Sequence, residues 1–207
     1  MDQQVLGILQ YEVEFQCKCA LTSASLMDQA YAADNYDGFW YALQGFLIAA
    51  ANLSKLFWGS RGNKELERLD LRKSLGVTDD SPLRDPDLRN DFEHFDTRVE
   101  EWFAKSKDRN FFGRTIGPHS AVVGGGPVEE RFQWYDPGTG VVTFLKHSVP
   151  LPAVKAAIIR IMPLVDRALH GPPLSERTCG TCGNLIPECT CLDAEGKPLD
   201  WGIKRPQ

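Results

Sequence analysis

Residues 34–59 read DNYDGFWYALQGFLIAAANLSKLFWG, and this stretch decides the fold class. Large apolar residues recur along it at spacings of three and four, which predicts one long amphipathic helix whose apolar face belongs to a core. Asp34 or Asn35 is suited to cap its start, and Gly59 to end it. The apolar positions expected to be buried are Phe39, Trp40, Leu43, Phe46, Leu47, Ala50, Leu53 and Phe57.

The segments on both sides of this stretch also favour helices. Residues 11–19 (YEVEFQCKC) alternate like a half-buried strand, but residues 1–33 as a whole carry a helical stripe and an Ala-rich second half. Length and Ala content favour a long helix. A shorter helix is expected from about residue 63 to 75, with Leu66, Leu69 and Leu75 as its apolar positions and Gly76 as its stop.

A fourth helix is expected after the turn-rich lead SPLRDP, where Asp85 is suited to cap and Pro86 to take the first helical position. The apolar stripe of this helix is spaced by three and four. Its members are Leu88, Phe92, Phe95, Val99, Trp102 and Phe103.

Beyond residue 112 the composition changes to Gly, Pro and small residues, so residues 113–127 are expected to form a loop. RFQWY (131–135) and VVTFL (141–145) flank DPGTG, which predicts a β-hairpin. Residues 151–169 are expected to form a fifth helix, kinked or broken at Pro163. The chain is therefore expected to be mainly α: a helical domain over residues 1–170, including a loop and hairpin at about 113–148, and a linker with a Cys-rich tail over 171–207.

Composition narrows the class of protein. The chain has 207 residues, 43% of them apolar and 25% charged, which is typical of a globular protein. Its longest apolar run is too short to span a bilayer, and its N-terminus does not look like a secretion signal. We therefore expect a cytoplasmic protein that does not enter the membrane. The net charge of −5 argues against a broad nucleic-acid surface driven by bulk charge, but not against a local RNA site.

The stretch RNDFEH, residues 89–94, is the strongest candidate for chemistry. On a helix Asn90 and His94 are neighbours, as are Arg89 and Glu93, whereas Arg89 and His94 point about 140° apart. Arg89 and His94 therefore converge best when two copies of the helix meet across a two-fold axis. The alternative is that these residues form ordinary surface ion pairs.

Context supports the first interpretation, although the same spacing recurs at Arg114 and His119 in the Gly-Pro loop. An Arg, a polar residue and a His on a late helix, after two long helices and a short one, resemble the signature of the HEPN family (higher eukaryotes and prokaryotes nucleotide-binding domain). The resemblance covers residues 1 to about 109, and the helix at 151–169 is expected to complete the bundle.

The resemblance implies a homodimeric, metal-independent endoribonuclease, with RNA as substrate and Arg89, Asn90 and His94 as its catalytic residues. A His moves protons near neutral pH, and an Arg stabilises charge developing on a phosphate. A neutralising or regulatory protein partner is compatible with this interpretation. Asp96 stands where some members carry a Tyr that is modified by such a partner, so this form of regulation is not expected. Other members lack nuclease activity, which leaves a non-catalytic RNA-binding, nucleotide-binding or assembly module as the alternative function.

The tail TCGTCGNLIPECTCLD, residues 178–193, predicts a zinc knuckle. Cys179 and Cys182 form a pair separated by two residues, and Cys189 and Cys191 supply two further thiolates. Four protein ligands leave no open position, so this zinc is expected to be structural, and no metal is expected to take part in catalysis. Redox-active thiols are the alternative.

Two further groups of residues receive a structural interpretation. Cys17 and Cys19 are expected to be small buried hydrophobes. The hairpin aromatics Phe132, Trp134 and Tyr135 either form a stacking surface for bases or attach the hairpin to its neighbours. We assign no role to the histidines outside RNDFEH.

Overall fold

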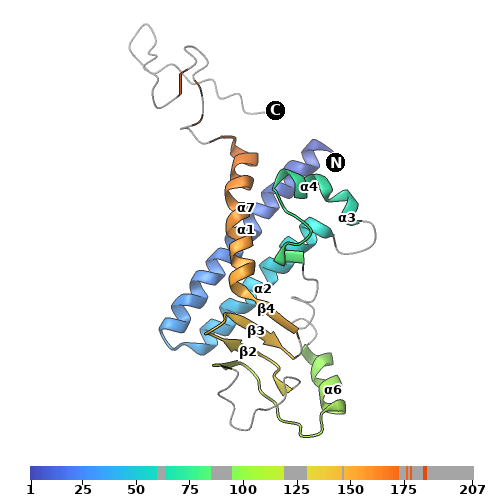
Figure 1. Cartoon of the computed structure of the whole chain (residues 1–207), viewed down its shortest axis with the longest axis vertical. Helices are drawn as coiled ribbons and strands as arrows, with labels where there is room; N and C mark the ends of the chain where they lie inside the picture. Colours follow the sequence, from blue (N-terminus) through green and yellow to red (C-terminus); the bar gives the residue numbers. More distant parts are fainter. Residues whose placement is uncertain are drawn as a thin grey trace.

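The computed structural model describes residues 1–59, 64–84, 95–118, 130–145, 147–172 and residues 176, 178, 184 and 185. These residues form a mainly helical chain with a small sheet, as predicted (Figure 1). Its elements are α1 (Gln3–Ala32), α2 (Tyr36–Trp58), α3 (Lys64–Glu67), α4 (Leu69–Ser74), η1 (Pro82–Arg84), α6 (Phe95–Lys105), β1 (Thr115–Ile116), β2 (Trp134–Asp136), β3 (Val141–Phe144), β4 (His147–Pro150) and α7 (Leu151–His170).

The two long helices begin where the sequence provides side-chain caps. The Asp2 carboxylate accepts the backbone N–H groups of Gln4 and Val5, at 2.8 and 3.2 Å, and starts α1. Asn35 Oδ1 accepts the N–H of Gly38 at 2.9 Å and starts α2, which ends at Gly59 with a φ of 79°. Both predicted helices are confirmed, and the strand alternative for residues 11–19 is wrong.

The core lies where α1, α2 and α7 pack together (Figure 1). Small residues let α1 and α2 approach closely: a Cβ added at Gly45 of α2 would lie 2.9 Å from Ser23 Oγ of α1. All eight apolar positions predicted on α2 are buried. α7 contributes Leu151, Val154, Ala157, Ile158, Ile161 and Val165 to the same core.

α7, the predicted fifth helix, continues through Pro163, so of the kink or break expected there the break is wrong. The apolar face of α7 extends past the proline to the buried Val165, and its packing on α1 outweighs the lost backbone hydrogen bond. None of the described helices is both long and apolar enough to cross a membrane.

The predicted hairpin is confirmed, and two strands are added to it. β2 and β3 pair antiparallel, β4 pairs antiparallel with β3, and β1 pairs parallel with β2. The two-residue β1 lies in the stretch expected to be a loop. Its neighbouring Gly and Pro residues are typical of loops, and so short a strand has no detectable sequence pattern of its own. Phe132 and Trp134 are fully buried, so these rings pack inside the protein and do not offer a stacking surface.

The short helix predicted at residues 63–75 is two helices, α3 and α4, separated at Arg68. Leu66 and Leu69 are exposed, whereas Leu71 and Leu75 are fully buried. Only α4 is therefore packed against the core by its apolar residues. The prediction of a single helix over residues 63–75 is wrong.

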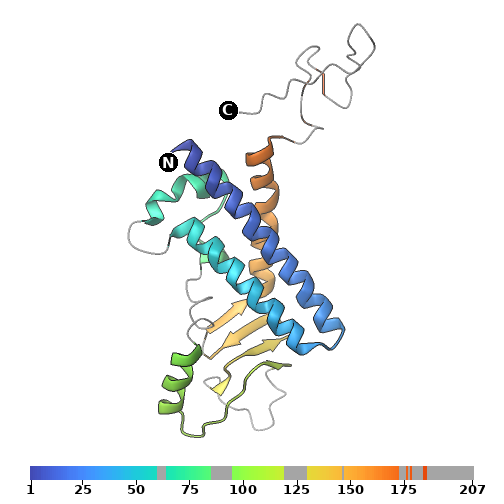
Figure 2. The same cartoon turned by 180° about the vertical axis from the view of Figure 1, so that it is seen from behind.

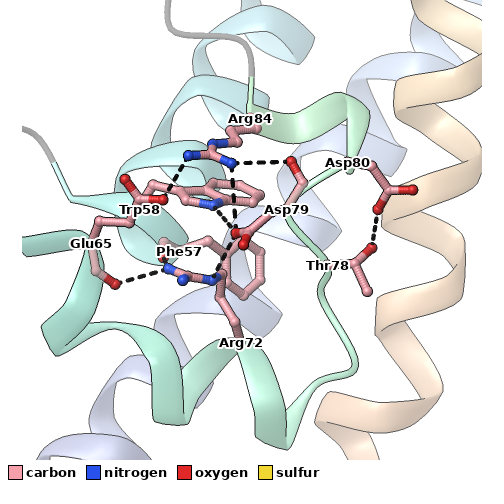
Figure 3. A network of polar contacts seen from close by, with 8 residues as sticks. All are labelled: Phe57, Trp58, Glu65, Arg72, Thr78, Asp79, Asp80 and Arg84. Atoms are coloured by element: carbon pink, nitrogen blue, oxygen red, sulfur yellow. Dashed lines mark hydrogen bonds and ion pairs between the residues drawn. The ribbon is translucent and has the colours of Figure 1, made fainter.

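A buried arginine connects α3, α4 and the end of α2 (Figure 3). Arg72 Nη1 donates to the carbonyl oxygens of Phe57 and Glu65, at 2.8 and 3.0 Å. Its Nε lies 3.6 Å from Asp79 Oδ1, which also accepts the indole N–H of Trp58. The guanidinium therefore donates to one carbonyl in the last turn of α2 and to another carbonyl in α3.

We predict that Arg72→Met destabilises the fold by about 3 kcal/mol, because the carbonyls of Phe57 and Glu65 lose the guanidinium donor and Asp79 loses one of its partners. Urea unfolding followed by circular dichroism measures the change. The matched control is Arg84→Met. Arg84 is exposed and pairs with Glu65 and Asp79, so its loss is expected to cost less than about 1 kcal/mol. Equal losses of unfolding free energy in the two variants would show that the buried contacts of Arg72 stabilise the fold no more than the exposed ion pairs of Arg84.

Candidate functional site

The predicted catalytic residues Arg89, Asn90 and His94 lie outside the described residues, as do the four tail cysteines. The structure does describe the helix that follows the motif, α6, whose first residue is Phe95. The described part of the candidate site is therefore α6 and the residues around it.

Aromatic contacts hold α6 against the sheet. The Phe95 ring lies 5.8 Å from that of Phe132 and 6.3 Å from that of Phe144, both at steep angles. The ring of Trp102, two turns further along α6, lies 5.1 Å from that of Phe132 and 5.9 Å from that of Phe111. Edge-to-face ring pairs of this kind stabilise a fold beyond the contribution of the apolar area that they bury. Phe95 and Trp102 of the predicted stripe therefore contact rings on the sheet side of the chain, whereas Phe103 of the same stripe is 50% exposed.

A buried carboxylate fixes the other end of α6. Glu130 accepts the indole N–H of Trp102 at 3.2 Å and the hydroxyl of Ser106, the residue that follows the helix. The Ser106 hydroxyl in turn accepts the backbone N–H of Arg109 at 2.8 Å. These bonds satisfy a buried charge with neutral donors, and they set the position of α6 relative to β2.

A cleft of about 540 Å³ opens between α2 and the elements around α6. Its walls come from α2, from Phe95 at the start of α6 and from the segments leading into β1 and β2. The lining residues are Asp37, Trp40, Tyr41, Gln44, Phe95, Phe111, Gly113, Arg114 and Gln133.

The cleft combines aromatic surface with paired polar groups. Arg114 Nη1 lies 3.9 Å from Asp37 Oδ1, so a donor and an acceptor stand side by side at the surface. Tyr41 is 79% exposed and offers a free ring. The indole N–H of Trp40 is buried and has no acceptor among the described residues. An aromatic wall beside a donor and an acceptor suits a planar polar ligand such as a nucleobase.

A second polar cluster joins α1 to α7. One ligand atom each from Glu14, Asp166 and His170 lies within 4.8 Å of the others, a grouping that metal sites also show. Here Lys18 Nζ lies 2.9 Å from Glu14 Oε1, and His170 Nε2 lies 3.7 Å from the same oxygen. A metal ion would have to displace this ammonium, so the cluster acts as an ion-pair network. No spacing in the sequence indicates this cluster, because α1 and α7 are far apart along the chain.

Cys17 is confirmed as a small buried residue. It is fully buried in the core of α1, and burial raises the pKa of its thiol to about 12. A buried thiol with so high a pKa carries little thiolate at neutral pH, which supports the interpretation of Cys17 as a packing residue. Cys19 is half-buried and packs against the same core.

Comparison of the chain with models of protein families, with curated proteins and with solved structures finds no match.

We predict that Glu14 contributes stability that is lost in acid. Its pKa is lowered from the ordinary value of 4.5, chiefly by the hydrogen bond from Lys18. A depressed folded-state pKa stabilises the fold above the unfolded value, and this contribution disappears as pH falls through the folded-state pKa. The gap in unfolding free energy between the wild type and Glu14→Gln should therefore be largest near neutral pH and shrink below 4.5.

Urea unfolding across this pH range checks the effect. Lys18→Met should narrow the same gap, because it removes the hydrogen bond that lowers the pKa of Glu14. Curves that stay parallel at every pH would contradict the assignment.

Proposed function

We propose that the chain is a HEPN-type, metal-independent endoribonuclease that works as a homodimer, with Arg89, Asn90 and His94 of both protomers in a composite cleft. The observation that carries the proposal is the cleft at the start of α6: Phe95, which is bonded to His94, lines it. The mainly helical bundle of α1, α2 and α7 is compatible with the expected fold.

The residues of the motif have the chemistry that RNA cleavage requires. His94 accepts the proton of a ribose 2′-OH or donates one to the leaving oxygen. Arg89 stabilises the charge that develops on the phosphate, and Asn90 orients its neighbours. This reaction needs no metal.

The described cleft supplies the adjoining surface for substrate. Tyr41 offers a ring for stacking, and Arg114 and Asp37 present a donor and an acceptor to the edge of a base. Every base carries adjacent donors and acceptors on its pairing edge. A donor and an acceptor such as Arg114 and Asp37 therefore bind an unpaired base without preferring one kind of base over another. The proposed substrate is therefore single-stranded RNA.

We predict that the purified chain cleaves a mixed RNA pool in EDTA, and that His94→Ala and Arg89→Ala each lower the rate at least about 100-fold. Gel analysis of end-labelled RNA measures the rate. Two variants serve as matched controls: His119→Ala removes the His of the second Arg/His spacing, and Arg98→Ala removes an arginine of α6 that pairs with Glu101. Both controls should cleave like the wild type.

Several results would reject the ribonuclease. A wild type that cuts nothing, or two motif variants that cut as fast as the wild type, would each do so. RNA that is bound but not cut would favour the second candidate function, a non-catalytic binding or assembly module. A specific observation favours assembly as well: α1 exposes Ile8, Tyr11 and Phe15, three large apolar side chains on one helix.

We also propose that Cys179, Cys182, Cys189 and Cys191 hold one structural zinc ion. The support is the spacing of the four thiols and the closed tetrahedral site that they complete. The zinc would order the tail and take no part in cleavage.

We predict about one zinc per chain under reducing conditions, measured by elemental analysis of the purified protein. Cys179→Ser together with Cys182→Ser should abolish the zinc, whereas Cys19→Ser, in α1, should retain it. Less than about 0.2 zinc per wild-type chain would instead indicate free or redox-active thiols.

A further inference from the structure

The stretch at the end of α6 has a charge opposite to that of the whole chain. The protein carries a net charge of −5, yet residues 105–114 (KSKDRNFFGR) contain four cations and one carboxylate. Lys105, Lys107 and Arg109 are exposed, and within the described part of the chain none of the three is paired with a carboxylate. Figure 2 shows this stretch at the lower end of the molecule, below the last turn of α6. Unpaired cations gathered in this way form a local site for anions.

Hydrogen bonds fix the turn that presents these cations. The Ser106 backbone N–H donates to the carbonyl oxygen of Trp102 at 2.7 Å, and the Ser106 hydroxyl donates to the buried Glu130. The same hydroxyl accepts the backbone N–H of Arg109 at 2.8 Å. Arg109 has a φ of 53°, a left-handed conformation that glycine adopts more easily than any residue with a side chain. The turn therefore holds an arginine where glycine would fit more easily, which points to a role for the guanidinium.

Exposed rings lie beside the cations. The Arg109 guanidinium lies 4.1 Å from the centre of the Phe103 ring, which is 50% exposed. Phe103 and the 51% exposed Phe111 both contact the ring of Trp102, at 6.2 and 5.9 Å. The cation–π contact orients the guanidinium, whose N–H groups have no acceptor among the residues that the structure describes. We call this surface the basic strip, and its members are Phe103, Lys105, Lys107, Arg109 and Phe111.

Carboxylates near the basic strip are outnumbered by its cations. Asp108 is the one carboxylate within residues 105–114. On α6, Glu101 is paired with Arg98 at 3.3 Å, and Glu100 points about 140° around the helix from Lys105. A phosphate that approaches the strip therefore meets a net positive surface on a chain that is negative as a whole.

We propose that the basic strip binds the backbone of a single-stranded nucleic acid. The lysine and arginine N–H groups bind phosphate oxygens, and Phe103 and Phe111 offer ring faces on which unpaired bases stack. Bases inside a duplex are already stacked on each other and do not reach such rings, so a single strand fits the strip better than a duplex. None of these contacts involves the 2′-OH, so DNA and RNA are expected to bind alike.

The basic strip goes beyond the proposed ribonuclease, because binding through it requires no cleavage. The strip adjoins the cleft, since Phe111 belongs to both, and Tyr41 and Arg114 belong to the cleft. A strand bound along the strip would therefore continue onto the surface proposed to hold a base. In a ribonuclease the strip would add phosphate contacts to those made at the cleft, without taking part in the reaction.

Fluorescence anisotropy with fluorescein-labelled oligo(dT) of about 12 nucleotides tests the strip in the full-length chain. DNA lacks the 2′-OH that the proposed cleavage needs, so binding is measured without cutting. Lys107→Ala combined with Arg109→Ala should weaken binding at least about 10-fold at low salt. Lys73→Ala combined with Arg160→Ala removes the same charge from exposed positions of α4 and α7, and this matched control should bind like the wild type. A wild type that does not bind, or strip and control variants that bind alike, would overturn the proposal.

The salt dependence separates phosphate contacts from stacking. Three phosphate contacts predict that the logarithm of the binding constant falls with that of the salt concentration with a slope of about −2, and the Lys107/Arg109 double variant should reduce this slope to about −0.7. Phe103→Ala should weaken binding at least about 5-fold and leave the slope unchanged, because stacking releases no counterions. Tyr11→Ala, at a ring of α1 that is 65% exposed, should change neither quantity.

Circular dichroism of each variant checks that it is folded. A duplex of the same length that binds as tightly as oligo(dT) would refute the assignment to single strands, and so would a Phe103→Ala variant with wild-type affinity.

The RNA assay separates the two proposals. If oligo(dT) binds through the basic strip and no RNA is cut in EDTA, the strip stands without the ribonuclease. If RNA is cut and the Lys107/Arg109 double variant binds oligo(dT) like the wild type, the ribonuclease stands without the strip.

Discussion

The close packing of α1 on α2 is the interaction on which the rest of the structure depends. Gly45 faces Ser23, and a line of alanines on both helices keeps side chains short where the helices meet. Short side chains allow a wide buried contact between the backbones, and α7 then packs on the pair. The sheet is attached to this bundle by Tyr135, whose ring lies 4.6 Å from that of Phe39.

Charged groups stabilise the contacts between helices at two places in the bundle. At one end Arg72 takes the place of an apolar core residue, with its donors on backbone carbonyls. Further along, Glu14 binds Lys18 and His170 between α1 and α7. Both groups are satisfied by named partners, which is why a buried ion is tolerated in each place.

The sequence predicted the parts of the fold that repeat with a regular period. The long helices, α7 and the hairpin follow from apolar spacing and from the turn at DPGTG. Three features escaped it: the two-residue β1, the division of the 63–75 helix at Arg68, and the burial of Arg72. Each depends on tertiary contacts, because a stripe such as Leu66 and Leu69 does not reveal whether anything covers it. The cleft residues Asp37, Tyr41 and Arg114 also lack a signal, since they meet only after folding, while Arg89, Asn90 and His94 lie outside the described part of the chain.

The attachment of α6 to the sheet has a mechanical consequence. One wall of the cleft belongs to α2, through Trp40 and Tyr41, and the other to the start of α6 and the segment before β1, through Phe95, Phe111 and Arg114. The ring of Tyr135, in β2, contacts that of Phe39, in α2, and joins these two parts outside the cleft lining. A substitution at Phe39 or Tyr135 would therefore act on the cleft indirectly, through the contact between its two walls, and would leave every residue of its lining in place.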